Sequence, residues 1–156
     1  MSPAGATIAT IGYQGAAPAR FIEALQEAGI EMLVDVRAAP WSRRPEFVQR
    51  ALAAMLAEAG IAYGHRPVLG NPEKGRQAAK AGESYQTIYN AHLDTAPART
   101  AIAALAAEAP VRRLCLMCME RDPAHCHRSL LADRLARDFG VAVDHLSVGA
   151  RQMSLF

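Results

Sequence analysis

The sequence has little of what would place the protein outside the cell or in a membrane. Its 156 residues include only three cysteines, an odd number that argues against the disulfide framework of a small secreted protein. The N-terminal residues lack the positive charge and apolar run of a signal peptide, and no apolar run approaches the roughly 20 residues of a membrane span. We therefore expect a cytoplasmic protein with no membrane partner.

Strong charge and internal repeats are also absent. A net charge of +2 is too small to indicate nucleic-acid binding by charge alone. The length suits one domain with a sizeable core, and the chain has no second hydrophobic unit. We predict a single domain over residues 1–148, followed by a flexible tail over residues 149–156.

Strand-like and helix-like segments alternate along the chain. Strands are expected at residues 7–11, 32–36, 61–65, 111–118 and 141–146. Helices are expected at residues 18–28, 46–59, 84–92, 97–109 and 123–138, and residues 66–83 are expected to form a long loop. This alternation predicts an α/β fold: a single three-layer domain with a mainly parallel sheet of about five strands and helices on both faces. The strand order stays open.

Polar side chains follow several of these strands, at the edge where open parallel sheets bind ligands. Asp35 and Arg37 close the second strand, and Cys118 and Glu120 close the fourth. The plainer interpretation makes Asp35 and Arg37 a structural ion pair and Cys118 a small core residue. We favour an active site, because the fold geometry independently selects this edge.

Residues 114–128 contain all three cysteines, and Asp122-Pro123 is expected to cap and start a helix. One hypothesis is a zinc site made of Cys115, Cys118, Cys126 and His127. Residues three apart on a strand point to opposite faces, which separates Cys115 from Cys118, and the adjacent residues 126 and 127 should diverge on a helix. We therefore predict no metal and no cofactor.

Two further hypotheses for this stretch are compatible with each other. Cys118 would be a nucleophile whose thiolate is favoured by Arg37, Arg128 and a helix N-terminus, with Glu120 or His127 as acid or base. Paired with Cys126, it would also cycle through a disulfide. In the second of these hypotheses, the two arginines and free helix N–H groups hold a phosphate, and Glu120 positions water, a sugar hydroxyl or a metal.

Four segments, residues 10–13, 34–37, 42–45 and 118–129, resemble the domain-of-unknown-function family 488. The resemblance covers roughly residues 7–147 and implies a compact α/β domain, with no established reaction. It implies as candidate site residues Tyr13, Asp35, Arg37, Arg43, Arg44, Cys118, Glu120, Cys126, His127 and Arg128. The Asp-Val-Arg at residues 35–37 is also similar to rhodanese-like domains, but Glu120 stands where their anion cradle would be, so sulfur transfer at Cys118 is a minority hypothesis.

The last five residues resemble the short peptide by which bacterial DNA-processing proteins dock on the replication sliding clamp. A glutamine would form hydrogen bonds, and adjacent Leu and Phe would fill an apolar pocket. This implies the sliding clamp as a partner, bound through Gln152, Leu155 and Phe156.

Together these observations predict an enzyme, a hydrolase or transferase, with a phosphate-binding pocket that acts on a nucleotide or nucleic acid. The predicted catalytic residues are Cys118, Glu120, His127 and Asp35, the last orienting Arg37. The predicted substrate-binding residues are Tyr13, Arg37, Arg43, Arg44, Arg128 and Cys126. One alternative is thiol redox chemistry at Cys118. The other is a non-catalytic adaptor that binds the clamp, and that contacts nucleic acid through Arg43, Arg44, Lys74, Arg76 and Lys80.

Overall fold

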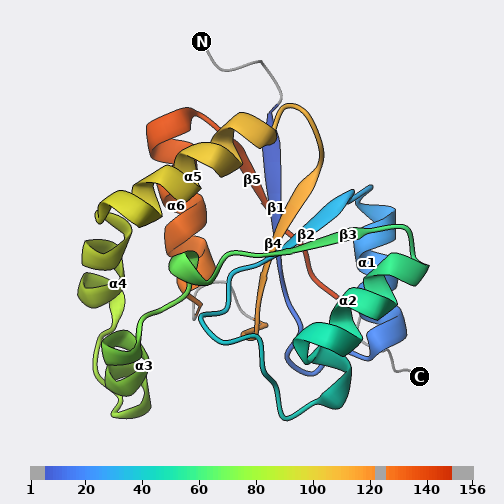
Figure 1. The fold of residues 1–156 in the computed structure, drawn as a ribbon, viewed down its shortest axis with the longest axis horizontal. Coiled ribbons are helices and arrows are strands. Elements are labelled where there is room, and N and C mark those ends of the chain that lie inside the picture. Colours follow the sequence, from blue (N-terminus) through green and yellow to red (C-terminus); the bar gives the residue numbers. More distant parts are fainter. Residues whose placement is uncertain (1–5, 122–125, 149–156) are drawn as a thin grey trace.

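The computed structural model describes residues 6–121 and 126–148 (Figure 1). Its five-stranded sheet has the order β3-β2-β4-β1-β5, and every pairing between neighbours is parallel. The strands are β1 (Thr7–Gly12), β2 (Met32–Asp35), β3 (Ala62–His65), β4 (Leu114–Cys118) and β5 (Ala142–His145). The predicted α/β class is confirmed. The order places β4 between β2 and β1, so the loops after these three strands meet.

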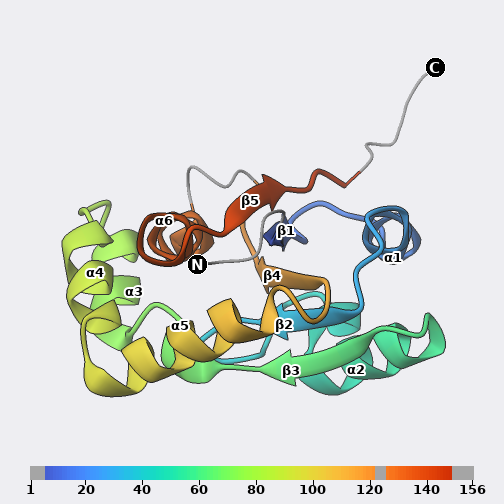
Figure 2. The ribbon, with the colours of Figure 1, turned by 90° about the horizontal axis from the view of Figure 1, so that it is seen from above.

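Helices cover both faces of the sheet, as predicted (Figure 2). One face carries α1 (Pro18–Glu27), the 3-10 turn η1 (Pro45–Phe47) and α2 (Gln49–Glu58). The other side carries α3 (Glu73–Lys80), α4 (Gln86–Leu93), α5 (Ala96–Glu108) and α6 (His127–Phe139). Within residues 6–121 and 126–148, no helix is long and apolar enough to cross a membrane.

Alternating strand side chains build a separate core on each face. Leu114, Leu116 and Cys118 of β4 pack with buried residues of α4, α5 and α6. Cys115 and Met117 of the same strand pack with buried residues of α1 and α2. Cys115 and Cys118 therefore lie on opposite faces, as their spacing predicted.

Three predicted elements need correction. The helix expected from residue 46 is divided into η1 and α2 by Val48, which is extended. The loop expected at residues 66–83 contains η2 (Pro67–Leu69) and α3. Because α3 buries only Gly75 and Ala78, its sequence has no apolar period to reveal it. The fourth strand begins at Leu114 rather than residue 111.

The start of α6 also differs from the prediction, in a way that bears on the site. The helix begins at His127 rather than Pro123, and the backbone of Cys126 before it is extended. The Cys126 sulfur accepts from the backbone N–H of Arg128 at 3.5 Å, so this sulfur caps the helix. The predicted cap residue Asp122 lies outside the described residues.

Candidate functional site

A cavity of about 310 Å³ opens beyond the carboxyl ends of the central strands. Tyr13 follows β1, Arg37 follows β2, and Glu120 follows β4, and all three line the cavity. Cys118, the last residue of β4, and His127, the first residue of α6, also line it. Five of the predicted site residues therefore meet at the sheet edge where the sequence predicted a site.

A second cavity, of about 430 Å³, lies beside α5 and α6. Four of the charged residues that line it form pairs: Arg134 lies 2.5 Å from Asp94, and Arg137 lies 2.9 Å from Asp138. Among the described residues that line it there is no thiol and no histidine. We therefore place the candidate site in the cavity at the end of the strands.

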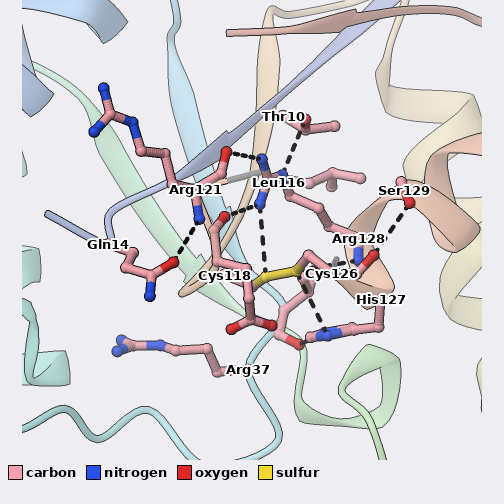
Figure 3. The surroundings of a disulfide bond; sticks show 12 residues. Thr10, Gln14, Arg37, Leu116, Cys118, Arg121, Cys126, His127, Arg128 and Ser129 are labelled. Atoms are coloured by element: carbon pink, nitrogen blue, oxygen red, sulfur yellow. Dashed lines mark hydrogen bonds between the residues drawn. A yellow bond between two sulfur atoms is a disulfide. The ribbon is translucent and has the colours of Figure 1, made fainter. Parts of the chain in front are cut away.

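Of the two cysteines proposed as a redox pair, Cys118 lines this cavity, and Cys126 is not among the described lining residues. Cys118 and Cys126 form a disulfide (Figure 3), with their Cα atoms 7.5 Å apart. Each is 1% exposed. The third cysteine, Cys115, is reduced and buried on the other face of the sheet, where burial raises the pKa of its thiol. This separation assigns any thiol chemistry of the cavity to Cys118 and Cys126.

The proton on His127 can be placed from its hydrogen bond. Its Nε2 lies 3.0 Å from the carbonyl oxygen of Val36, which can only accept, so Nε2 carries the proton and donates. Burial lowers the pKa of His127, and the neighbouring Arg128 charge acts in the same direction. The neutral ring leaves the lone pair of Nδ1 unprotonated, 3.8 Å from the Cys126 sulfur.

Glu120 completes a cluster with these three residues. An oxygen of its carboxyl group, a ring nitrogen of His127 and the two sulfurs of the disulfide all lie within 4.8 Å of one another. Burial raises the pKa of the Glu120 carboxyl, and Arg128 only partly offsets this. The four residues are the predicted catalytic residues Cys118, Glu120 and His127, together with Cys126.

Arg128 lies beneath this cluster and holds the loop after β4. It is fully buried, and its Nε donates to the Thr10 hydroxyl at 3.1 Å. Its terminal nitrogens donate to the carbonyl oxygens of Glu120 and Arg121 and, at 3.9 Å, to the Cys118 sulfur. Arg128 is not among the described residues that line the cavity. This geometry supports a role for Arg128 in positioning the loop, and does not support the predicted direct contact with an anion.

Gly12 allows this loop to approach β1. A Cβ atom at residue 12 would lie 1.7 Å from the carbonyl oxygen of Glu120 and 2.9 Å from an Arg128 nitrogen. Any side chain larger than hydrogen would therefore force the Glu120 backbone to move.

Asp35 and Arg37 form a bidentate pair at the end of β2. Arg37 Nε donates to Asp35 Oδ1 at 2.9 Å, and Nη2 donates to Oδ2 at 2.7 Å. Tyr63 of β3 donates to Oδ2 at 2.6 Å, and Arg37 Nη1 donates to the Phe47 carbonyl at 2.8 Å. Asp35 is fully buried and is not among the described lining residues. The geometry supports the predicted orienting role of Asp35 and gives it no contact with the cavity.

The two arginines predicted after residue 42 are placed away from the cavity. Arg44 donates to the Tyr13 carbonyl at 3.1 Å, and its guanidinium lies 4.7 Å from the Phe47 ring centroid. Arg43 is exposed, and neither arginine is among the described lining residues. Tyr13 stacks on Phe47 with ring centroids 4.5 Å apart, so it lines the cavity as part of a rigid aromatic pair. The predicted clamp residues Gln152, Leu155 and Phe156 lie outside the described residues.

The cavity is also lined by residues that the sequence analysis did not assign to it. Trp41 is 64% exposed, and Arg76 and Lys80 lie one helical turn apart on α3. The side-chain oxygen of Asn71 is buried without a hydrogen-bond partner among the described residues. The sequence feature that could have assigned Trp41 to the site is that it is a large aromatic residue in an otherwise polar loop. The lysine and arginine had been assigned only to the adaptor alternative.

Comparison with known proteins gives one match. A family model described as "Domain of unknown function DUF488" matches residues 17–135. No curated protein and no solved structure matches the chain.

Proposed function

The chain belongs to the DUF488 family, a family of unknown function, and from the residues that line its cavity we propose that it is an enzyme that binds a nucleotide or a nucleic-acid segment at the strand ends. The observation that carries the proposal is the exposed Trp41 on the same cavity as the cations of Arg76 and Lys80. Cys118 and Glu120, which line the same cavity, are the assigned reacting groups.

The exposed side chains that line the cavity supply two kinds of contact to a nucleotide, stacking on the base and charge pairing with the phosphate. An aromatic ring stacks on a base irrespective of its identity, worth about 1–3 kcal/mol for each base. Arginine and lysine bind phosphate oxygens through charge-assisted hydrogen bonds. Arg76 and Lys80 are both exposed and four residues apart, so they present neighbouring cations to one ligand.

The fluorescence of Trp41 provides a direct test, because the chain has a single tryptophan. Titration with a single-stranded oligonucleotide, a nucleoside monophosphate and inorganic phosphate should quench it for the first two ligands. The variant Arg76→Ala/Lys80→Ala should bind the oligonucleotide at least about tenfold more weakly, and its salt dependence should fall by about one unit of slope per cation removed.

Lys74→Ala is the matched control, since Lys74 is exposed on the same helix but is not among the described lining residues. It should retain wild-type affinity. Unchanged Trp41 fluorescence with every ligand, or an equal loss for Lys74→Ala, would remove the proposal.

Thiol reactivity separates an enzyme from the non-catalytic adaptor. In reduced, metal-free protein, Cys118, which lines the cavity, should react with iodoacetamide faster than a model thiol. Peptide mapping should find Cys115 unmodified, because it lies in the apolar core on the other face of the sheet. A Cys118 no faster than the model thiol would leave the adaptor as the better description.

We also propose docking on the bacterial sliding clamp, on the strength of Gln152, Leu155 and Phe156 in the sequence. A fluorescent peptide of the last eight residues should bind purified clamp, and the full chain should compete with it. Competition that survives deletion of residues 152–156, or that is absent from the start, would contradict this partner.

A further inference from the structure

The cluster of Cys118, Glu120, Cys126 and His127 has the composition of a metal site. Thiolate sulfur, imidazole nitrogen and carboxylate oxygen are the usual ligands of zinc in proteins. Around a tetrahedral ion with bonds of about 2.0–2.3 Å, neighbouring ligand atoms lie roughly 3–4 Å apart. The four candidate ligand atoms already lie within 4.8 Å of one another.

We propose that the reduced protein binds one zinc-type divalent cation through Cys118, Glu120, Cys126 and His127, and that the disulfide is the metal-free form of the same site. The disulfide joins two of the four ligands, so the oxidised protein cannot offer both thiolates. This goes beyond nucleotide binding, because the metal needs neither Trp41 nor the cations of α3.

A second observation is the way His127 is held. Metal-bound histidines commonly donate their other ring N–H to a backbone carbonyl, which fixes the ring orientation and the free lone pair. His127 has this arrangement: Nε2 donates to the Val36 carbonyl at 3.0 Å, and Nδ1 lies on the side of the Cys126 sulfur. The Tyr89 ring packs edge-on against the imidazole, with centroids 5.1 Å apart.

The charges around the cluster also suit a cation. Two thiolates and one carboxylate around a divalent ion leave a net charge of −1. The buried Arg128 guanidinium donates to the Cys118 sulfur and to the Glu120 carbonyl, so a compensating positive charge is in contact with two of the ligand residues.

The structure explains why the sequence argued against zinc. The expected ligand set included Cys115, which lies on the opposite face of the sheet. The set also assumed that Cys126 and His127 diverge on a helix, whereas Cys126 is extended and precedes it. With Glu120 in the place of Cys115, the four ligands converge on one side.

The conversion between the disulfide form and the reduced, metal-bound form conserves atoms and electrons. Dithiothreitol reduces the disulfide to two thiols and is itself oxidised to its cyclic disulfide; metal binding then displaces one proton from each thiol. In the reverse direction, hydrogen peroxide accepts one electron from each thiolate and two protons from solvent and becomes two waters, the sulfur–sulfur bond forms, and the cation is released.

Cobalt(II) is the probe, because its spectrum reports both geometry and sulfur ligation. The full chain is reduced, freed of dithiothreitol without oxygen, and titrated with Co²⁺ and then Zn²⁺. We expect one equivalent of tetrahedral Co²⁺ with a thiolate-to-metal charge-transfer band, displaced by Zn²⁺, and no such spectrum from the oxidised protein. Octahedral Co²⁺ without charge transfer, or no stoichiometric binding, would overturn the proposal.

Variants locate the ligands. Cys126→Ser and Glu120→Gln should each weaken Zn²⁺ binding at least about tenfold, while Cys115→Ala, the matched control on the other face, should retain wild-type affinity and spectrum. A Cys115→Ala protein that loses binding would contradict the assigned site. Should Cys126→Ser fail to fold, the milder Glu120→Gln decides, because an unchanged affinity and spectrum in that variant would exclude Glu120 as a ligand. No nucleotide is present in the metal titration, so a failure to bind metal would not count against the proposed nucleotide binding.

Discussion

The ends of β2 and β4 carry charged and reactive side chains at the same edge of the sheet, but they use them differently. Beyond β2, the charges of Asp35 and Arg37 are paired with each other, and Tyr63 and the Phe47 carbonyl hold the pair through further hydrogen bonds, although Arg37 also lines the cavity. Beyond β4, the ligand atoms of Glu120 and its three partner residues face one another at a cavity. A charged residue at a strand end is therefore a weak sign of a site. Reactive atoms that converge on one point are a stronger sign.

The largest effect should come from breaking the β2 pair. Asp35→Ala leaves the Arg37 guanidinium buried without its carboxylate, and loss of one partner of a buried ion pair costs about 3–5 kcal/mol. The free energy of unfolding in urea measures this loss.

The double variant Asp35→Leu/Arg37→Met is the control for that prediction. Replacing both charges with apolar groups removes the uncompensated ion, so most of the lost stability should return. A double variant no more stable than Asp35→Ala would show that the pair holds the fold through more than charge compensation.

The next largest effect should come from Gly12→Ala, which acts on the β4 side. The new methyl group would meet the Glu120 carbonyl at 1.7 Å and force the backbone to shift, costing about 3 kcal/mol, the upper end for overpacking. Because Glu120 moves, metal affinity should fall as well. Urea denaturation and Zn²⁺ titration measure the two effects.

Gly60→Ala is the comparison for Gly12. A Cβ at Gly60 meets nothing within 4 Å, but its φ of +77° strains an alanine by about 1 kcal/mol. It should lose stability without losing metal affinity. Equal loss of affinity in both variants would mean that general destabilisation, rather than the Glu120 contact, governs the site.

The strand ends were predictable to within about two residues, because continuous apolar runs meet their first charged residue at Asp35 and at Glu120. The opposite faces of Cys115 and Cys118 were predictable from strand alternation. The start of α6 was not: Asp122-Pro123 is the stronger local signal, but the helix begins after Cys126, whose sulfur also bonds to Cys118, a contact set by tertiary structure. The burial of Arg128 likewise depends on carbonyl acceptors in the loop after β4, a contact that no local pattern reveals.

The two faces of β4 should respond differently to serine. In reduced, metal-free protein, Cys115→Ser places a hydroxyl in an apolar core and should cost about 2 kcal/mol. Cys118→Ser places it beside an Arg128 donor at the cavity and should cost less than about 1 kcal/mol. Thermal and urea denaturation compare them. A larger loss for Cys118→Ser would mean that the β4 end is structural, like the β2 end.

The smallest loss of stability should come from Tyr63→Phe, which removes the hydrogen bond from Tyr63 to the Asp35–Arg37 pair. The Tyr63 hydroxyl donates to Asp35 at 2.6 Å, and its loss should cost about 1 kcal/mol at neutral pH.

Burial, followed by the Asp35 carboxylate, raises the pKa of Tyr63 above its usual value. The folded protein therefore retains this proton at a pH where the unfolded chain, with a tyrosine pKa of about 10, releases it. The contribution of Tyr63 is complete below that pH and is lost as the pH rises toward the folded-state pKa. Urea denaturation at several pH values should show the gap between wild type and Tyr63→Phe constant to about pH 9 and narrower above pH 10. A stability difference between the two proteins that widens above pH 10 would mean that the folded state favours the ionised Tyr63 hydroxyl. Asp35 would then not be the charged acceptor of this hydroxyl, and the paired charges that distinguish the end of β2 from the end of β4 would be wrong.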